Sequence, residues 1–289
     1  VSVVIGVRDG QAQLAATLAS IQNQEGVPLE MIVVNDGSSD GTAALLDQTA
    51  SADPRVRVLH RPQRGLTAAL IEGCQQAQGV FIARQDCGDC SLPGRLQQQF
   101  QALLAAPDAV LCSTHARFVV PEGAVVHEQR PRQEDLQDGL TGPAHHGSVM
   151  MRRAAYEQAG GYRPMFFYAQ DIDLWSRLAE LGTHTVVPEV LYEAGVSPGS
   201  ISGLQSREQR RFHALISAAT AARRCQRSEA PWLAGAAALT ERCRRRRPDP
   251  RRRARGAYFI AACLEPHDPE LAQRYLQEAL IQDPWHLKA

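Results

Sequence analysis

The sequence lacks several features that would assign a chain of this size to a common class of protein. No apolar run reaches the roughly 18 residues that a membrane-spanning helix needs, and the N-terminus opens with a β-type run, not with a charged segment and a signal core. Its 31 basic and 31 acidic residues leave no net charge, so its overall field does not indicate a polyanion-binding protein. We therefore expect a soluble, cytoplasmic chain.

Cysteine is sparse and offers little for metal or redox chemistry. Seven cysteines, an odd number, are scattered over 289 residues, and a chain of this length does not need disulfide bonds for stability. Cys87 and Cys90 have C-x-x-C spacing, but no second pair and no H-x3-H pair is present to complete a zinc site. Reduced thiols are expected, and small side chains in a tight loop are the simpler interpretation of the pair.

The first 107 residues alternate short β-branched runs with amphipathic segments, which is typical of parallel βαβ units with right-handed crossovers. The spacing of Leu14, Leu18 and Ile21 predicts a first helix, and Pro93 suits the first position of a later helix that runs to residue 104. A Rossmann-type oxidoreductase would share the alternation, but no G-x-G-x-x-G follows Val7. Strands are predicted at 1–7, 30–34, 56–59, 80–83 and 109–113, and a further helix at 42–49.

The pattern changes after residue 113, and the chain then divides again near residue 203. Antiparallel strands are expected near Phe118 and Val125, and a stretch rich in Ala, Arg and Leu without strand signals begins at about Leu204. The predicted fold is an α/β domain at 1–203, with a Rossmann-like, mostly parallel sheet flanked by helices, and an all-α extension at 204–289. Further predicted elements are strands at 148–151 and 185–187, helices at 153–159 and 172–181, and breaks in the extension at Pro231, 248–250 and 266–269.

Acidic side chains follow two of the predicted strands at the same edge of the sheet. Asp36 lies two positions after the strand at 30–34, and Asp86 and Asp89 follow the strand at 80–83. Ligands of open α/β sheets bind at the carboxyl ends of the strands. A strand that ends in Asp-Gly is by itself an ordinary turn, so the inference depends on both motifs together. Two acids three positions apart can share Mg²⁺ or Mn²⁺, which prefer oxygen ligands and bridge carboxylates to a diphosphate.

Four motifs in order give a more specific indication. They are Val-Ser-Val-Val-Ile at 1–5, Val-Val-Asn-Asp-Gly-Ser-Ser-Asp-Gly-Thr at 33–42, Ile-Ala-Arg-Gln-Asp-Cys-Gly-Asp at 82–89, and Gly-Gly-Tyr at 160–162 leading to Gln-Asp-Ile-Asp-Leu-Trp at 170–175. Together they resemble the GT-A glycosyltransferases of family 2 over about residues 1–203. The resemblance implies a nucleotide-diphosphosugar donor, a divalent cation (Mg²⁺ or Mn²⁺) and inversion at the anomeric carbon.

The resemblance also implies roles for individual acids. Asp36 matches the residue that contacts the nucleotide base, and Asp86 opens the D-x-D element that holds ribose, diphosphate and metal. Asp171 matches the catalytic base, and a carboxylate there can take the proton of a sugar hydroxyl that attacks a carbon with oxocarbenium character. Asp173, two positions further along a helix, cannot face the same way and is expected to interact with the helix dipole.

The sequence departs from the family pattern at several positions. Gly88 stands where the second acid of D-x-D is expected, so we expect Asp89 to replace it as a metal ligand. Arg8 and Asp9 replace the usual Tyr-Asn and are expected on the donor side, although Arg8 is equally typical of a solvated loop charge. His146 is expected near the diphosphate and acceptor, with a weaker case for the preceding histidine, His145.

The expected partners follow from these assignments. The chain is predicted to be an inverting, hexosyl-transferring enzyme with a saccharide or lipid-linked acceptor, in surface polysaccharide or glycoconjugate synthesis. The alternative is a catalytically inactive GT-A-like protein that binds a saccharide or a partner, a hypothesis prompted by Gly88 and by Gln170 in place of a Glu. The arginines between Arg242 and Arg255 lack interleaved aromatics, which argues against nucleic acid. They fit either a solvated helical surface or peripheral contact with the anionic inner face of a membrane.

Overall fold

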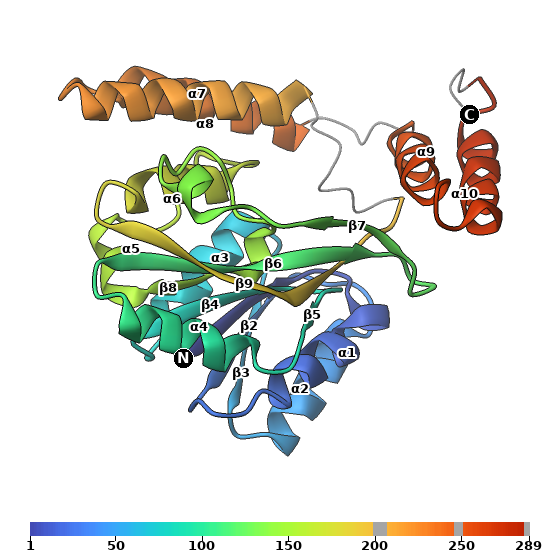
Figure 1. Cartoon of the computed structure of the whole chain (residues 1–289), viewed down its shortest axis with the longest axis horizontal. Coiled ribbons are helices and arrows are strands. Elements are labelled where there is room, and N and C mark those ends of the chain that lie inside the picture. The colour runs from blue at the N-terminus through green and yellow to red at the C-terminus, as the bar shows by residue number, and fades with distance from the viewer. Residues whose placement is uncertain (199–206, 246–250, 286–289) are drawn as a thin grey trace.

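The computed structural model describes residues 1–198, 207–245 and 251–285. A nine-stranded sheet lies at its centre in the order β3-β2-β1-β4-β8-β6-β9-β5, with β7 paired to β6 (Figure 1). The strands are β1 (Ser2–Val7), β2 (Glu30–Asp36), β3 (Val56–Arg61), β4 (Phe81–Asp86), β5 (Cys90–Ser91), β6 (Ala109–Val119), β7 (Val125–Gln129), β8 (Met150–Arg152) and β9 (Thr183–Gly195). The helices of this part are α1 (Gln11–Gln22), α2 (Thr42–Ala52), α3 (Leu66–Gln75), α4 (Arg95–Ala105), α5 (Arg153–Gln158) and α6 (Gln170–Leu178).

The four strands β3, β2, β1 and β4 are parallel and form the half of the sheet that the sequence predicted. Helices cover both faces, so successive residues of β1 are buried on opposite sides: Ile5 packs with Leu14 and Leu96, whereas Val4 packs with Leu70 and other residues of a second core. The predicted helix after Pro93 begins two residues later, at Arg95, because Gly94 adopts a left-handed φ of 81°. This half of the sheet places the ends of β1, β2 and β4 at one edge.

The other half of the sheet is mixed. β8 is antiparallel to both β4 and β6, and β9 runs parallel to β6. β9 has 13 residues, far more than the three predicted at 185–187. The reason is a bulge around Pro188: Thr114 pairs with Val187, but the next residue of β6 pairs with Val190. The extra residues break the alternation that marks a strand in the sequence.

The predicted helical extension is confirmed and consists of α7 (Arg207–Arg224), α8 (Ala230–Arg245), α9 (Arg252–Leu264) and α10 (Pro269–Gln282). The first pair lies over α6, where Phe212 and Leu239 pack with Phe166 (Figure 1). The second pair packs against β6, β7 and β9, so that Phe118 and Tyr192 share a core with both helices. None of the described helices combines the length and the apolar character needed to cross a bilayer. The expected boundary at 203/204 lies outside the described residues, as do 248–250.

Candidate active site

The site lies where β1, β2 and β4 end together. Gly6 of β1 pairs with Asp86 of β4, and Val7 pairs with Asn35, the residue before Asp36. Asp36 is buried, and its two carboxylate oxygens accept hydrogen bonds from the backbone amides of Arg64 and Gly65 at 2.6 and 2.8 Å. Asp36 therefore fixes the loop that follows β3 while it faces the edge of the sheet at which α/β proteins bind ligands.

Arg8 and Asp9 follow β1 at the same edge. Asp9 adopts a positive φ of 49° and accepts hydrogen bonds from the amide and hydroxyl of Ser39 at 2.7 and 3.1 Å. It thereby ties the loop after β1 to the loop after β2. The exposed Arg8 guanidinium lies 3.5 Å from the Asp9 carboxylate and extends toward solvent beside this edge.

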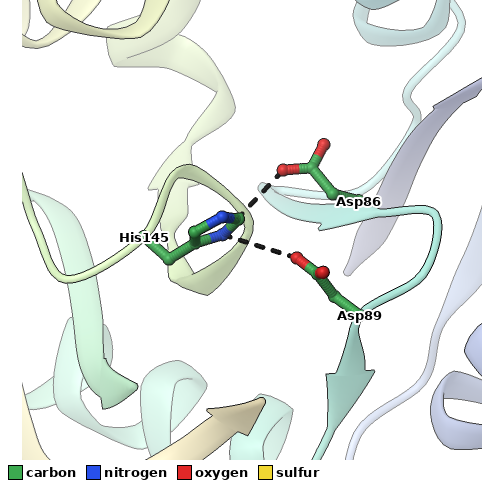
Figure 2. Close-up of side chains that lie close together, drawn as sticks. All are labelled: Asp86, Asp89 and His145. Atoms are coloured by element: carbon green, nitrogen blue, oxygen red, sulfur yellow. Dashed lines mark ion pairs between the residues drawn. The ribbon is translucent and has the colours of Figure 1, made fainter. Parts of the chain in front are cut away.

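His145 lies beside Asp86 and Asp89, although the histidine comes from a segment far along the chain from the turn that carries both acids (Figure 2). Nδ1 of His145 lies 3.9 Å from Oδ2 of Asp86 and 3.5 Å from Oδ2 of Asp89. Each of the three residues offers one possible metal-ligand atom, and these three atoms lie within 4.8 Å of one another. The sequence favoured His146, but the structure brings His145 to the two acids.

Gly88 occupies a turn between Asp86 and Asp89 that disfavours a side chain at position 88. Its φ of 97° is a conformation that side-chain-bearing residues rarely adopt. An acid at position 88 would be strained there, whereas the turn directs Asp89 inward, where it is 7% exposed. The Tyr192 hydroxyl donates to Oδ2 of Asp89 at 2.7 Å, and the Gly195 amide donates to Oδ1 at 2.9 Å.

The two acids have opposite pKa shifts. Burial raises the pKa of Asp89 to about 6, although His145 opposes this shift. Burial also acts to raise the pKa of Asp86, but nearby positive charge, above all that of Arg84, outweighs it and lowers that pKa to about 2. Two neighbouring carboxyls with divergent pKa values are typical of a functional site.

Two fully buried arginines hold the segments that form this site together. Arg84 donates to the Val4 carbonyl at 2.6 Å and forms an ion pair with Asp86. Arg95 donates to the Gln85 side chain at 2.9 Å and to the Gly147 carbonyl at 2.7 Å. Through these two bonds, Arg95 of α4 is joined both to β4 and to the turn that carries His145. The sequence does not indicate a role for either arginine, because only their contacts in the folded structure distinguish them from surface charges.

Tyr192 is a second residue that the sequence did not reveal. Besides its bond to Asp89, its hydroxyl accepts from the Asp86 amide at 3.2 Å, and its ring lies 5.4 Å from the His145 ring. The Tyr192 hydroxyl also lies against the backbone at Gly147, where only glycine leaves room for it, because a Cβ there would lie only 1.8 Å from this hydroxyl. Tyr192 thus holds all three members of the cluster in place.

His146 turns to a different partner. Its Nε2 lies 2.7 Å from the Tyr162 hydroxyl, and its ring packs edge-on against Trp175. Burial, followed by the charge of Arg84, lowers the pKa of His146 to about 3. The ring is therefore neutral near pH 7 and is suited to hydrogen bonding beside the site, not to supplying a proton.

Asp171 lies in the first turn of α6, where its Oδ1 accepts from the Ile172 amide at 2.9 Å. Burial raises its pKa; the charge of Asp86 adds to this effect and that of His145 opposes it. Asp173 faces away, is fully buried, and accepts from Arg177 at 2.6 Å. The sequence predicts an interaction of Asp173 with the helix dipole, and the structure shows a buried ion pair with Arg177.

Comparisons with known proteins identify the family and the fold. Residues 2–160 match the profile described as "Glycosyl transferase family 2". The protein named "Putative glycosyltransferase EpsE" of Bacillus subtilis (strain 168) is 33% identical over 190 residues, which cover 63% of this chain and 67% of EpsE. The amylovoran biosynthesis glycosyltransferase AmsE of Erwinia amylovora is 28% identical over 184 residues, which cover 62% of this chain and 68% of AmsE. Other relatives are longer, and the chain spans 34% of one and 20% of another.

A solved structure extends the similarity to nearly the whole chain. It is the mannosyltransferase PcManGT from Pyrobaculum calidifontis in complex with GDP-Man and Mn²⁺, with a TM-score of 0.59, 20% sequence identity, and coverage of 98% of this chain and 86% of that chain. At this identity the likeness concerns the fold. The sequence match and the architecture together show that this chain is a GT-A protein and belongs to glycosyltransferase family 2.

Proposed function

We propose that this protein is an inverting glycosyltransferase that moves a hexose from a nucleotide diphosphosugar to a saccharide or lipid-linked acceptor. The observation that carries the proposal is the placement of Asp86, Asp89 and His145 at the ligand-binding edge of the sheet, with Asp171 within their electrostatic reach. The names of EpsE and AmsE support a glycosyltransferase, and that of AmsE supports a role in polysaccharide synthesis. GDP-Man in the PcManGT structure supports a nucleotide-sugar donor.

On the donor side, Asp36, Arg8 and Asp9 line the loops that would receive the nucleotide. Each Asp36 oxygen accepts one backbone hydrogen bond and keeps a second lone pair for a base or ribose donor. The exposed Arg8 guanidinium can reach a phosphate oxygen. The proposal therefore places the nucleotide over the ends of β1 and β2, with its diphosphate directed toward β4.

The residues present fit a divalent cation. Asp86, Asp89 and His145 offer two carboxylates and one imidazole, and carboxylates suit Mg²⁺ and Mn²⁺. Both Asp89 oxygens already accept a hydrogen bond but retain a lone pair each. When bound, the cation neutralises the charge that grows on the leaving diphosphate.

Asp171 is proposed as the general base. As the acceptor oxygen forms a bond to the anomeric carbon, the bond from that carbon to the diphosphate oxygen breaks, and its electron pair leaves with the nucleotide. The acceptor proton passes to the Asp171 carboxylate. The raised pKa of Asp171 makes this carboxylate a stronger base than an exposed aspartate.

A panel of UDP- and GDP-sugars, each with Mn²⁺ or Mg²⁺, tests the proposed function. We expect one donor to release its nucleotide in the presence of the protein, and the rate to rise when a suitable acceptor is added. Released nucleotide is measured by coupled assay, with boiled protein as the control. Donor binding without any release across the panel would instead favour the inactive saccharide- or partner-binding alternative.

We also propose peripheral contact between the arginine cluster and an anionic membrane. Arg244 and Arg245 end α8, and Arg252 and Arg253 begin α9; all four are exposed. Arg246 and Arg247 lie outside the described residues. Each favourably placed Arg contributes about 1 kcal/mol of attraction to an anionic leaflet.

Replacing Arg244, Arg245, Arg252 and Arg253 by Gln should therefore reduce cosedimentation with vesicles that contain phosphatidylserine. Binding of the parent protein should also weaken as salt rises, because the attraction is screened. Neutral vesicles serve as the control, and hydrolysis of a soluble donor should persist in the variant. Unchanged sedimentation with anionic vesicles would contradict membrane contact through these arginines.

A further inference from the structure

The segment that leads into α6 is held in an unusual conformation. Ala169, two residues before Asp171, adopts a left-handed φ of 56°, which a residue with a side chain adopts only when its surroundings impose it. Asp171 is then carried on the first turn of the helix. The orientation of the Asp171 carboxylate thus depends on what fixes residues 163–169.

Hydroxyl groups from two other elements hold three consecutive residues of this segment. Thr240 of α8 donates to the Met165 carbonyl at 2.6 Å and accepts from the Phe167 amide at 3.2 Å. Thr67 of α3 donates to the Phe166 carbonyl between them at 2.9 Å. Thr240 is 3% exposed, so water does not readily replace its two hydrogen bonds.

Charged groups fix the start of the same segment to the same helix pair. Arg163 donates two hydrogen bonds to the Glu229 carboxylate at 3.0 and 2.7 Å. Glu229 also accepts from Arg223 of α7 at 2.6 Å, and Arg223 donates to the Ser176 hydroxyl of α6 at 3.1 Å. The helix pair therefore contacts both the segment before Asp171 and the helix after it.

Aromatic packing completes the attachment. The Phe212 ring of α7 lies 6.2 Å from both the Phe166 ring and the Tyr168 ring. Phe166 and Phe212 are buried with Leu239, the residue next to Thr240. Figure 1 shows α7 and α8 lying along the side of the domain that carries α6.

We propose that Thr240 and Glu229, from the C-terminal extension, are positioning residues that hold residues 163–169 so that Asp171 faces the acceptor. The inference rests on the proposed function, in which Asp171 is the base. It assigns α7 and α8 a part in catalysis that is separate from any contact of the extension with a membrane. Neither residue touches the donor side of the site, so donor binding does not depend on them.

The pH dependence of turnover reports the position of Asp171. Desolvation of the half-buried Asp171 carboxyl raises its pKa; the charge of Asp86 adds to this effect and that of His145 opposes it. A loosened segment would admit water to Asp171 and bring its pKa down toward that of an ordinary aspartate. The acidic limb of the kcat profile would then move to lower pH.

The test replaces Thr240 by Val, which keeps the shape but removes the hydroxyl. We expect kcat for transfer to fall by roughly 10- to 100-fold, because a displacement of about 1 Å costs on this order, while KM for the donor and binding of the nucleoside diphosphate stay unchanged. Thr240→Ser should restore most of the rate. Thr49→Val, which removes a helical hydroxyl bonded to Leu45 in α2, is the matched control and should retain full activity.

The outcomes separate this inference from the proposed function. Normal kcat and an unmoved acidic limb in Thr240→Val, with Asp171→Asn inactive, would overturn the positioning role alone. Full transfer by Asp171→Asn would remove the base and the inference with it. If Thr240→Val does not fold, Glu229→Gln takes its place, and a normal kcat in that folded variant would overturn the proposal.

Discussion

Sugar transfer is expected to fall by about 100- to 10,000-fold when Asp171 is replaced by Asn, because the variant cannot accept the acceptor proton. Donor binding should stay nearly intact, since Asp36 and Asp86 lie on other elements. Transfer to acceptor and equilibrium binding of the donor are measured separately. Asp108→Ala, which removes an exposed acid outside the site, provides the control.

The pH dependence of kcat in the parent enzyme should agree with a role for Asp171 as the base. Burial raises the pKa of Asp171, so the base form is lost, and kcat falls, as the pH drops through a value above that of an ordinary aspartate. The acidic limb of the profile should disappear in Asp171→Asn. Near-normal transfer by this variant would contradict a role for Asp171 in the reaction.

Stability offers a further check that the Asn variant remains folded. Because the pKa of Asp171 is higher in the folded chain than in the unfolded chain, the folded chain binds the proton more tightly, and its free energy of unfolding decreases as the pH rises through that interval. Asn carries no charge and avoids this loss. The variant should thus be at least as stable as the parent at neutral pH in denaturant titrations, with a smaller difference below pH 4 or so.

Loss of either acid of the cluster should have the second large effect. Asp86→Ala and Asp89→Ala are each expected to weaken Mn²⁺-dependent donor binding by more than the roughly 10- to 100-fold that loss of outer-shell partners costs. Excess chelator should weaken donor binding by the parent to the same extent. Titration calorimetry with and without Mn²⁺ measures both effects, and Asp108→Ala is again the control.

A double replacement distinguishes the geometry of this turn from the simple number of acids. Gly88→Asp combined with Asp89→Ala restores the usual D-x-D spelling but places a side chain at a φ of 97°. We expect it not to restore metal-dependent binding.

The chelator experiment on the parent protein has an outcome that would contradict a metal site. Full activity in excess chelator would show that protein groups alone stabilise the leaving diphosphate.

The sequence predicted the parallel half of the fold well because neighbouring residues along the chain are enough to mark its strands. β1, β2 and β4 are buried on both faces and therefore appear as continuous apolar runs. β5 has only two residues and leaves no pattern. β9 is long but interrupted at Pro188, so its pairing with β6 becomes apparent only in three dimensions.

The residues of the candidate site likewise fall into those that a local motif indicates and those that only the fold brings together. Asp36, Asp86 and Asp171 stand at the ends of strands or at the start of a helix, where short motifs make them candidates. Tyr192 lies 103 positions from Asp89, and no local spacing could indicate that contact. The sequence also could not indicate which of the two histidines lies beside the acids, because the adjacent residues His145 and His146 contact different partners.

The packing of α9 and α10 on the sheet has a consequence for synthesis on the ribosome. Phe118 of β6 shares its core with Ala279 of α10, which is translated 161 residues later. At about 5 to 20 residues per second, roughly 8 to 32 seconds pass between the two. During this interval the nascent chain presents an apolar sheet face that has no cover. We expect chaperones that bind exposed apolar segments to engage the growing chain here, and premature termination before α9 to yield an aggregating product.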